Sequence, residues 1–213
     1  MITKEIYDQY LENLVSGNRN KCREIVETLM KANIDIKDLY INLFQTSMYQ
    51  VGDMWESNQI SVATEHLATS ITESLMTLIY PNIFSKEHTG KRAIITCIAN
   101  EFHQIGARMV ADIFEINGWD GYFLGTNTPI QDLINFIEIK NPDLVCFSLS
   151  VYFNINELIK TLEAVRSQYP KLRIIVGGQA FRWGGKEIAE TYTNVVYIDT
   201  LDKLENLLKE EMN

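Results

Sequence analysis

The sequence has little of what nucleic-acid-binding, membrane and secreted proteins require. Lys and Arg number 19 against 28 Asp and Glu, and the net charge of −9 disfavours direct contact with a phosphate backbone. No apolar run reaches the roughly 18 residues that cross a bilayer, and the first residues lack the apolar segment of a signal peptide. The three cysteines show no CxxC spacing, and Cys97 and Cys146 lie in apolar runs. Buried free thiols of this kind indicate the reducing cytoplasm.

The short motifs of several common enzyme classes are missing as well. No GxGxxG follows the first apolar strand and no GxxxxGK[ST] occurs, which argues against both common kinds of nucleotide site. No serine lies in a GxSxG turn and the chain has three histidines, so a hydrolase site fits no better. No His/Cys cluster supplies the three or four ligands of a zinc site.

The first part of the chain, residues 1–84, shows apolar residues at helical spacing. Helices are predicted over 3–17, 20–33, 36–56 and 61–80. Ser61 is the expected N-cap of the last of these and Pro81 its expected stop. Short connections between four helices indicate an antiparallel bundle. The polar stretch 85–91 contains a glycine and suits a linker.

The second part, residues 92–213, alternates short apolar runs with helical stretches. Strands are predicted over 92–99, 121–125, 143–150, 172–178 and 195–198. Helices are predicted over 105–118, 130–141, 155–168, 183–192 and 201–212. This alternation predicts a parallel sheet covered on both faces. The expected fold is therefore a four-helix bundle followed by a flavodoxin-like, Rossmann-type, doubly wound α/β domain with five strands.

Several residues with useful chemistry fall at the predicted strand ends, where such sheets bind ligands. His103, in the stretch NEFHQIG, follows the first strand; Ser148 and Ser150 close the third, and Gly177 and Gly178 close the fourth. Each alone has an ordinary explanation, as a solvated histidine, a capping serine or a turn glycine. Together they outline a groove with one potential metal ligand, two hydroxyls and two positions without side chains. Such a groove suits a long, flat-sided ligand.

These strand ends carry three motifs, in the order Glu101-x-His103-x-x-Gly106, Ser148-x-Ser150 and Gly177-Gly178. Over residues 90 to 213 they resemble the signature of cobalamin-binding domains. The resemblance implies that His103 replaces the benzimidazole base as the lower axial ligand of cobalt. It also implies that Glu101 holds the other ring N–H of His103, and that Gly106 leaves room for the nucleotide tail.

The resemblance assigns the remaining strand-end residues to the buried base. The first serine, Ser148, would hydrogen-bond the base, and the glycine pair would let the backbone approach it. Two positions depart from the methyl-transferring members of the family. Glu101 stands in place of the commoner Asp, and Asn154 stands where those members have a hydroxyl that extends the His–carboxylate relay. Both departures count against methyl transfer.

A fourth motif lies in the helical part, where Trp55 is followed after nine residues by Glu65 and His66. It resembles the W-x9-EH motif of light-sensing adenosylcobalamin proteins, which implies that these side chains pack around the 5′-deoxyadenosyl group. Alone, the Trp would be read as core and the Glu-His pair as a solvated face. The family's light sensors usually carry an N-terminal DNA-binding module, whereas this chain begins with the helical cap. Glu56 replaces a histidine of the best-known sensors, so the illuminated state is expected to differ.

Three functions share His103 and the groove. The first is a sensor that binds adenosylcobalamin and signals in trans to a partner protein, such as a transcription regulator, a kinase or a methyltransferase. The second is a corrinoid protein that carries methyl groups as methylcobalamin, and the third is a carrier that delivers cobalamin. A mutase is disfavoured because no substrate barrel is encoded. The W-x9-EH motif favours the sensor, a binding module rather than an enzyme, and a homo-oligomer is compatible with it.

Overall fold

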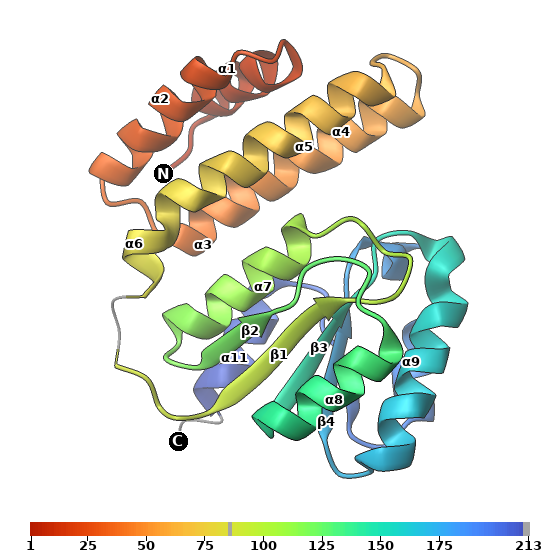
Figure 1. Cartoon of the computed structure of the whole chain (residues 1–213). Coiled ribbons are helices and arrows are strands. Elements are labelled where there is room, and N and C mark those ends of the chain that lie inside the picture. The colour runs from red at the N-terminus through yellow and green to blue at the C-terminus, as the bar shows by residue number, and fades with distance from the viewer. Residues whose placement is uncertain (85–86, 211–213) are drawn as a thin grey trace. The chain divides into compact units, whose positions relative to one another are not determined.

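The computed structural model describes residues 1–84 and 87–210, and the chain divides into two compact units, residues 1–84 and residues 85–213 (Figure 1). The first unit is built from helices and the second contains a sheet. The first two residues of the predicted linker and the last two of the final predicted helix lie outside the described residues.

The helical unit consists of α-helices, one π-helical segment and one 3-10 turn. In chain order they are α1 (Lys4–Val15), α2 (Arg19–Lys31), α3 (Ile36–Leu39), a π-helical segment (Tyr40–Gln45), α4 (Thr46–Glu56), α5 (Val62–Met76), a 3-10 turn (Thr77–Ile79) and α6 (Tyr80–Ile83). The run from α3 to α4 is continuous, as predicted for 36–56. Ser61 caps α5 by accepting a hydrogen bond from the Thr64 N–H at 3.2 Å, which confirms that prediction.

The expectation that Pro81 ends the fourth helix is wrong. The helix α5 ends at Met76, and Pro81 lies in the first turn of α6. The missing N–H of proline is harmless there, because the first N–H groups of a helix have no partner within the helix. The bundle is held by a core of fully buried side chains, among which Tyr10 and Phe44 pack with ring centroids 6.1 Å apart.

The α/β unit alternates strands and helices throughout. Its elements are β1 (Arg92–Cys97), α7 (Ile105–Ile116), β2 (Asp120–Phe123), α8 (Ile130–Lys140), β3 (Leu144–Ser148), α9 (Ile155–Gln168), β4 (Arg173–Gly177), α10 (Lys186–Thr191), β5 (Val195–Tyr197) and α11 (Leu201–Glu210). Short 3-10 turns, Tyr152–Asn154 and Gln179–Arg182, precede α9 and α10. The strands within the described residues pair in parallel in the order β2-β1-β3-β4-β5, which confirms the predicted doubly wound sheet.

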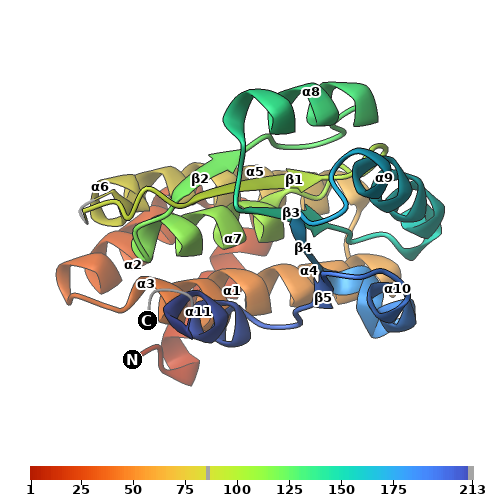
Figure 2. The same ribbon diagram turned by 90° about the horizontal axis from the view of Figure 1, so that it is seen from below.

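The sheet of the α/β unit is covered on both faces. Helices α8 and α9 lie over one face and α7 and α11 over the other (Figure 2). The central strands are therefore apolar almost throughout: β1 is buried from its second residue onward. Burial also accounts for the cysteines, since Cys22, Cys97 and Cys146 are all buried free thiols, as predicted for the latter two.

The described part of the predicted linker is fastened to the α/β unit. The Thr89 N–H and hydroxyl both donate to the Gly118 carbonyl, at 2.7 and 3.0 Å. His88 Nδ1 lies 2.6 Å from an Asp120 carboxylate oxygen, and its Nε2 lies 3.6 Å from Glu115. Asp120 is the first residue of β2, and Glu115 and Gly118 lie at or just after the end of α7, whereas His103 follows the end of the parallel strand β1. His88 is thus held at the opposite edge of the sheet from His103.

None of the helices in residues 1–84 and 87–210 has the length and apolar character needed to cross a membrane.

We predict that Gly178→Ala destabilises the α/β unit strongly. Gly178 has a φ of 114°, and a Cβ there would lie 2.3 Å from the Leu149 carbonyl oxygen. Backbone strain of this kind costs about 1–3 kcal/mol even before the overlap is counted. The control is Gly52→Ala in α4, where a Cβ would meet nothing within 4 Å and removing a mid-helix glycine adds roughly 0.5–1 kcal/mol of stability. Thermal unfolding followed by circular dichroism measures both, and equal melting temperatures would contradict the prediction.

Candidate functional site

The ends of the three central strands lie side by side. In the parallel register Cys97 of β1 pairs with Ser148 of β3, and Ser148 pairs with Gly177 of β4. The strand ends that the sequence singled out are therefore neighbours at the carboxyl edge of one sheet. In the sheet β1 lies next to β3 although β2 comes between them in the chain, so the strand order reverses there. Doubly wound sheets bind ligands at such a reversal.

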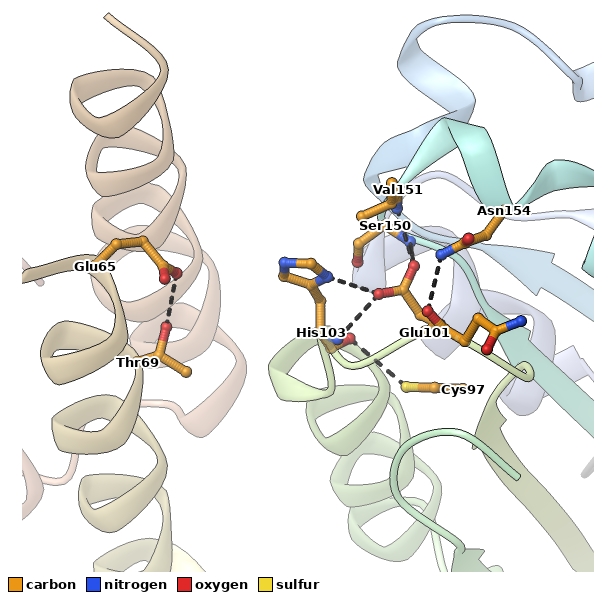
Figure 3. Close-up of polar contacts among 9 residues, drawn as sticks. Glu65, Thr69, Cys97, Glu101, His103, Ser150, Val151 and Asn154 are labelled. Carbon is orange, nitrogen blue, oxygen red and sulfur yellow. Dashed lines mark hydrogen bonds and ion pairs between the residues drawn. The ribbon is translucent and has the colours of Figure 1, made fainter. Parts of the chain in front are cut away.

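A buried carboxylate organises this edge. Glu101, in the loop after β1, is fully buried. Its Oε1 accepts a hydrogen bond from the backbone N–H of His103 at 3.0 Å and lies 2.6 Å from Nδ1 of the His103 ring (Figure 3). Its Oε2 accepts from the N–H groups of Ser150 and Val151, at 2.8 and 2.9 Å. The carboxylate therefore joins the loop after β1 to the loop after β3. The Glu101–His103 pair expected from the sequence is present, and the contribution of Val151 was not foreseen.

These hydrogen bonds keep Glu101 ionised. Burial alone would raise the pKa of Glu101, but the hydrogen bonds from His103, Val151 and Ser150 outweigh it and hold the pKa below its ordinary value. A carboxylate next to Nδ1 favours the tautomer that carries its proton there, which leaves Nε2 as the nitrogen with metal-binding character. The His103 side chain is 59% exposed, in contrast to its buried partner.

Three asparagines and a cysteine hold the loop that carries Glu101 and His103. The Asn100 N–H donates to the Asn127 side chain at 2.9 Å, and the Asn100 carbonyl accepts from the Asn154 amide at 3.0 Å. The Cys97 thiol donates to the His103 carbonyl at 3.6 Å; burial, helped by the charge of Glu101, raises the pKa of this thiol to about 12. From the sequence, Asn154 was interpreted only as the replacement of a relay hydroxyl, and its hydrogen bond to Asn100 was not predicted. Asn100 and Asn127 both adopt positive φ, which asparagine tolerates better than most residues.

The glycines at this edge are of two kinds. A Cβ on Gly106 would meet nothing within 4 Å, so the space beside the start of α7 is open. Gly177 and Gly178 instead face the protein itself, since added Cβ atoms would lie 2.8 Å from the Ile198 carbonyl oxygen and 2.3 Å from that of Leu149. Close packing of the chain is therefore a sufficient reason for these two glycines, besides the approach to a ligand predicted from the sequence.

The W-x9-EH residues lie at one end of a helix pair in the helical unit. Trp55 is in the last turn of α4 and Glu65 and His66 are near the start of α5, with the turn 57–61 between them. Trp55 is 48% exposed, so it is not a core residue of the described unit. The Thr69 hydroxyl donates to Glu65 at 3.0 Å, and His66 Nε2 lies 3.6 Å from the second Glu65 oxygen.

The donor set narrows the kind of metal group that the α/β unit can hold. Among the described residues no group of three or more His, Cys, Asp or Glu side chains is placed to bind a metal ion. One imidazole oriented by a buried carboxylate can supply a single metal ligand. Such a site fits a metal whose other positions are filled by a macrocycle, and no atom of the described residues lies within 4 Å of a Cβ at Gly106 to block an appended tail. The residues present therefore fit cobalamin.

Comparisons with known proteins agree with this geometry. Two family models, both described as B12 binding domain, match residues 91–207 and 6–80. The chain is 22% identical to the methionine synthase of Mycobacterium leprae over 202 residues, which are 90% of this chain and 17% of that protein. It is 28% identical over 134 residues to the HTH-type transcriptional repressor CarH of Myxococcus xanthus, covering 62% of this chain and 44% of the repressor.

A solved structure matches nearly the whole chain. It is the Methanosarcina barkeri monomethylamine corrinoid protein, with a TM-score of 0.83, 17% sequence identity, and coverage of 98% of this chain and 99% of that one. The chain spans less than half the length of the two curated relatives named above. Since a family model matches more than half of its residues, and its strand-end loops present a carboxylate-oriented histidine, this chain belongs to the B12-binding-domain family.

Proposed function

We propose that this protein binds cobalamin with its own base detached and His103 as the lower axial ligand, prefers adenosylcobalamin, and serves as a light-responsive sensory module. The proposed sensory function rests on one observation: Trp55 is exposed at the end of α4, and the Glu65–His66 pair follows near the start of the next helix, α5. The proposed binding residues are Trp55, Glu65, His66, Glu101, His103, Gly106, Ser148, Ser150, Gly177 and Gly178.

On the α/β unit, the residues bind and orient. Glu101 fixes the tautomer and the ring plane of His103, and a histidine held in this way is a stronger ligand than a mobile one. Ser148, half-buried at the end of β3, offers a hydroxyl to the detached base. The space beside Gly106 receives the nucleotide tail. When bound, adenosylcobalamin would supply a cobalt–carbon bond that light can break.

On the helical unit, the residues select the upper group. An indole that is half exposed leaves a large apolar surface in water, and an adenine ring stacked on it would cover that surface. Glu65 is held in place by Thr69, and its carboxylate can accept hydrogen bonds from ribose hydroxyls. A methyl group could use neither feature. The W-x9-EH residues therefore support adenosylcobalamin over methylcobalamin.

The output of such a module passes to a separate protein. The proposed partner is a transcription regulator, a kinase or a methyltransferase acting in trans, and the net charge of −9 disfavours direct binding to nucleic acid. The three buried free thiols support a place in the reducing cytoplasm.

A second candidate is a corrinoid protein that carries methyl groups. It is favoured by the fold shared with the monomethylamine corrinoid protein over nearly the full length of both chains. Two features count against it. Asn154 supplies an amide where a relay hydroxyl would be needed, and the exposed Trp55 and the Glu65–His66 pair would have no role in holding a methyl group.

The decisive experiment is a dark–light comparison on the full chain. Protein reconstituted with adenosylcobalamin in the dark is exposed to green light, and the absorption spectrum and backbone hydrogen exchange are recorded before and after. We expect the spectrum to change and exchange to rise in residues 46–76, because light removes the group that Trp55 and Glu65 hold. Protein loaded with hydroxocobalamin is the control. A spectral change with unaltered exchange would mean photolysis without signalling and would favour the methyl carrier.

Trp55→Ala should reduce the preference for adenosylcobalamin. Stacking of a base on an aromatic side chain contributes about 1–3 kcal/mol, so we expect affinity for adenosylcobalamin to fall roughly tenfold or more, since about 1.4 kcal/mol corresponds to a factor of ten. Affinity for methylcobalamin should change little. Isothermal calorimetry measures both ligands, and Trp183→Ala, which removes a 72% exposed tryptophan of the α/β unit, is the control. Equal affinities for the two cobalamins in the unaltered protein would contradict the proposal.

Gly106→Leu should weaken cobalamin binding without harming the fold. The open space beside Gly106 accommodates a side chain in the cofactor-free protein, whereas the same side chain would occupy the position proposed for the nucleotide tail. We expect a loss of affinity of at least about tenfold, which is roughly 1.4 kcal/mol, and a nearly unchanged melting temperature. Gly52→Leu in α4 serves as a control with equally open surroundings. Parallel losses of affinity and melting temperature would show that Gly106 serves packing alone.

A further inference from the structure

Asn154 occupies the helix position at which asparagine normally caps, yet it does not cap. It is the N-cap residue of α9, and no side-chain capping hydrogen bond is formed there. An N-cap asparagine ordinarily accepts a hydrogen bond from its own helix. Here the side-chain amide donates instead to the Asn100 carbonyl, 3.0 Å away in the loop after β1 (Figure 3). The side chain therefore serves a neighbouring loop rather than its own helix.

The residue that Asn154 binds has a left-handed backbone. Asn100 has a φ of 64°, a conformation that asparagine adopts more readily than most L-residues. Its N–H and its carbonyl are both bound by side-chain amides, those of Asn127 and Asn154, which come from the loops after β2 and β3. Asn127, with a φ of 50°, also donates its N–H to the Glu101 carbonyl at 3.0 Å. We call Asn100, Asn127 and Asn154 the asparagine clasp.

The clasp fixes the residue directly before Glu101. Glu101 in turn orients His103, and its carboxylate is already satisfied by His103 and by the N–H groups of Ser150 and Val151. Asn154 makes its hydrogen bond to the Asn100 carbonyl and not to the Glu101 carboxylate. An amide donates a hydrogen bond but neither takes up nor releases a proton near neutral pH, so this arrangement supplies position without proton transfer.

We infer that Asn154 is a positioning residue, which through Asn100 holds the loop of Glu101 and His103 in its ligand-ready conformation before cobalamin binds. The inference rests on the proposed role of His103 as lower axial ligand. Outer partners of a metal ligand typically change metal affinity 10–100-fold when they are replaced. Because the side chain of Asn154 does not cap α9, its replacement removes no hydrogen bond from that helix.

The test uses Asn154→Asp, which is nearly isosteric, retains a residue suited to the N-cap and turns the donor into an acceptor facing the Asn100 carbonyl. Asn154→Gln keeps the donor on a longer arm. The control is Asn135→Asp, an exposed asparagine of α8 whose oxygen accepts from Gln131 at 3.0 Å. His103→Ala defines complete loss of the lower ligand. Hydroxocobalamin is titrated into each full-length variant in the dark, the absorption spectrum reports imidazole coordination, and circular dichroism gives the cofactor-free melting temperature.

We expect Asn154→Asp to bind about tenfold more weakly than Asn135→Asp, with part of its spectrum shifted toward that of His103→Ala and with a similar melting temperature. Asn154→Gln should recover part of the coordination. Wild-type affinity and spectrum in Asn154→Asp would overturn the inference, as would a joint loss of affinity and melting temperature that Asn154→Gln does not relieve. Failure of the unaltered protein to show imidazole coordination would instead overturn the proposed function.

Discussion

The candidate site depends on one buried charge. The Glu101 carboxylate is fully buried, and a buried carboxylate is stable only when hydrogen bonds replace the water it has lost. It receives hydrogen bonds from the backbone of His103, Ser150 and Val151 and pairs with the His103 ring. Because these donors come from loops after two different strands, the ion and the local shape of the sheet edge require each other. The longer side chain of glutamate, compared with aspartate, suits this span between loops.

The sheet explains why the site could be anticipated. In a parallel sheet the carboxyl ends of all strands lie at one edge, so residues that follow separate strands become neighbours whatever their distance in sequence. Ser148 and Gly177 are 29 positions apart and occupy paired positions. The periodicity of apolar residues was enough to locate the strands, and their alternation with helices predicted a parallel, doubly wound sheet. The Glu101–His103 contact was also foreseeable, since it joins residues two positions apart.

Other features depend on tertiary contacts that no local pattern encodes. The stop expected at Pro81 failed because proline is also a good residue for a first helical turn, and the sequence does not say which role applies. The asparagine clasp joins three loops, and neither a positive φ nor an absent capping bond can be inferred from the letter N. Gly178 was expected to make room for a ligand, yet its positive φ and the nearby Leu149 carbonyl already require glycine there. A functional motif and a packing constraint can thus coincide at one residue.

The two units carry different amounts of information about function. Among the described residues, the α/β unit presents one imidazole oriented by a buried carboxylate, which fits cobalamin without identifying its upper group. A methyl carrier and a light sensor would need the same lower side. Similarity to the monomethylamine corrinoid protein is therefore compatible with either function, because it reports the fold. Discrimination depends on the residues that meet the upper group, and those proposed for that role in the helical unit are a half-exposed tryptophan and a carboxylate held by Thr69. A surface of that size and polarity matches a nucleoside far better than a methyl group, which is the physical reason for favouring the sensor.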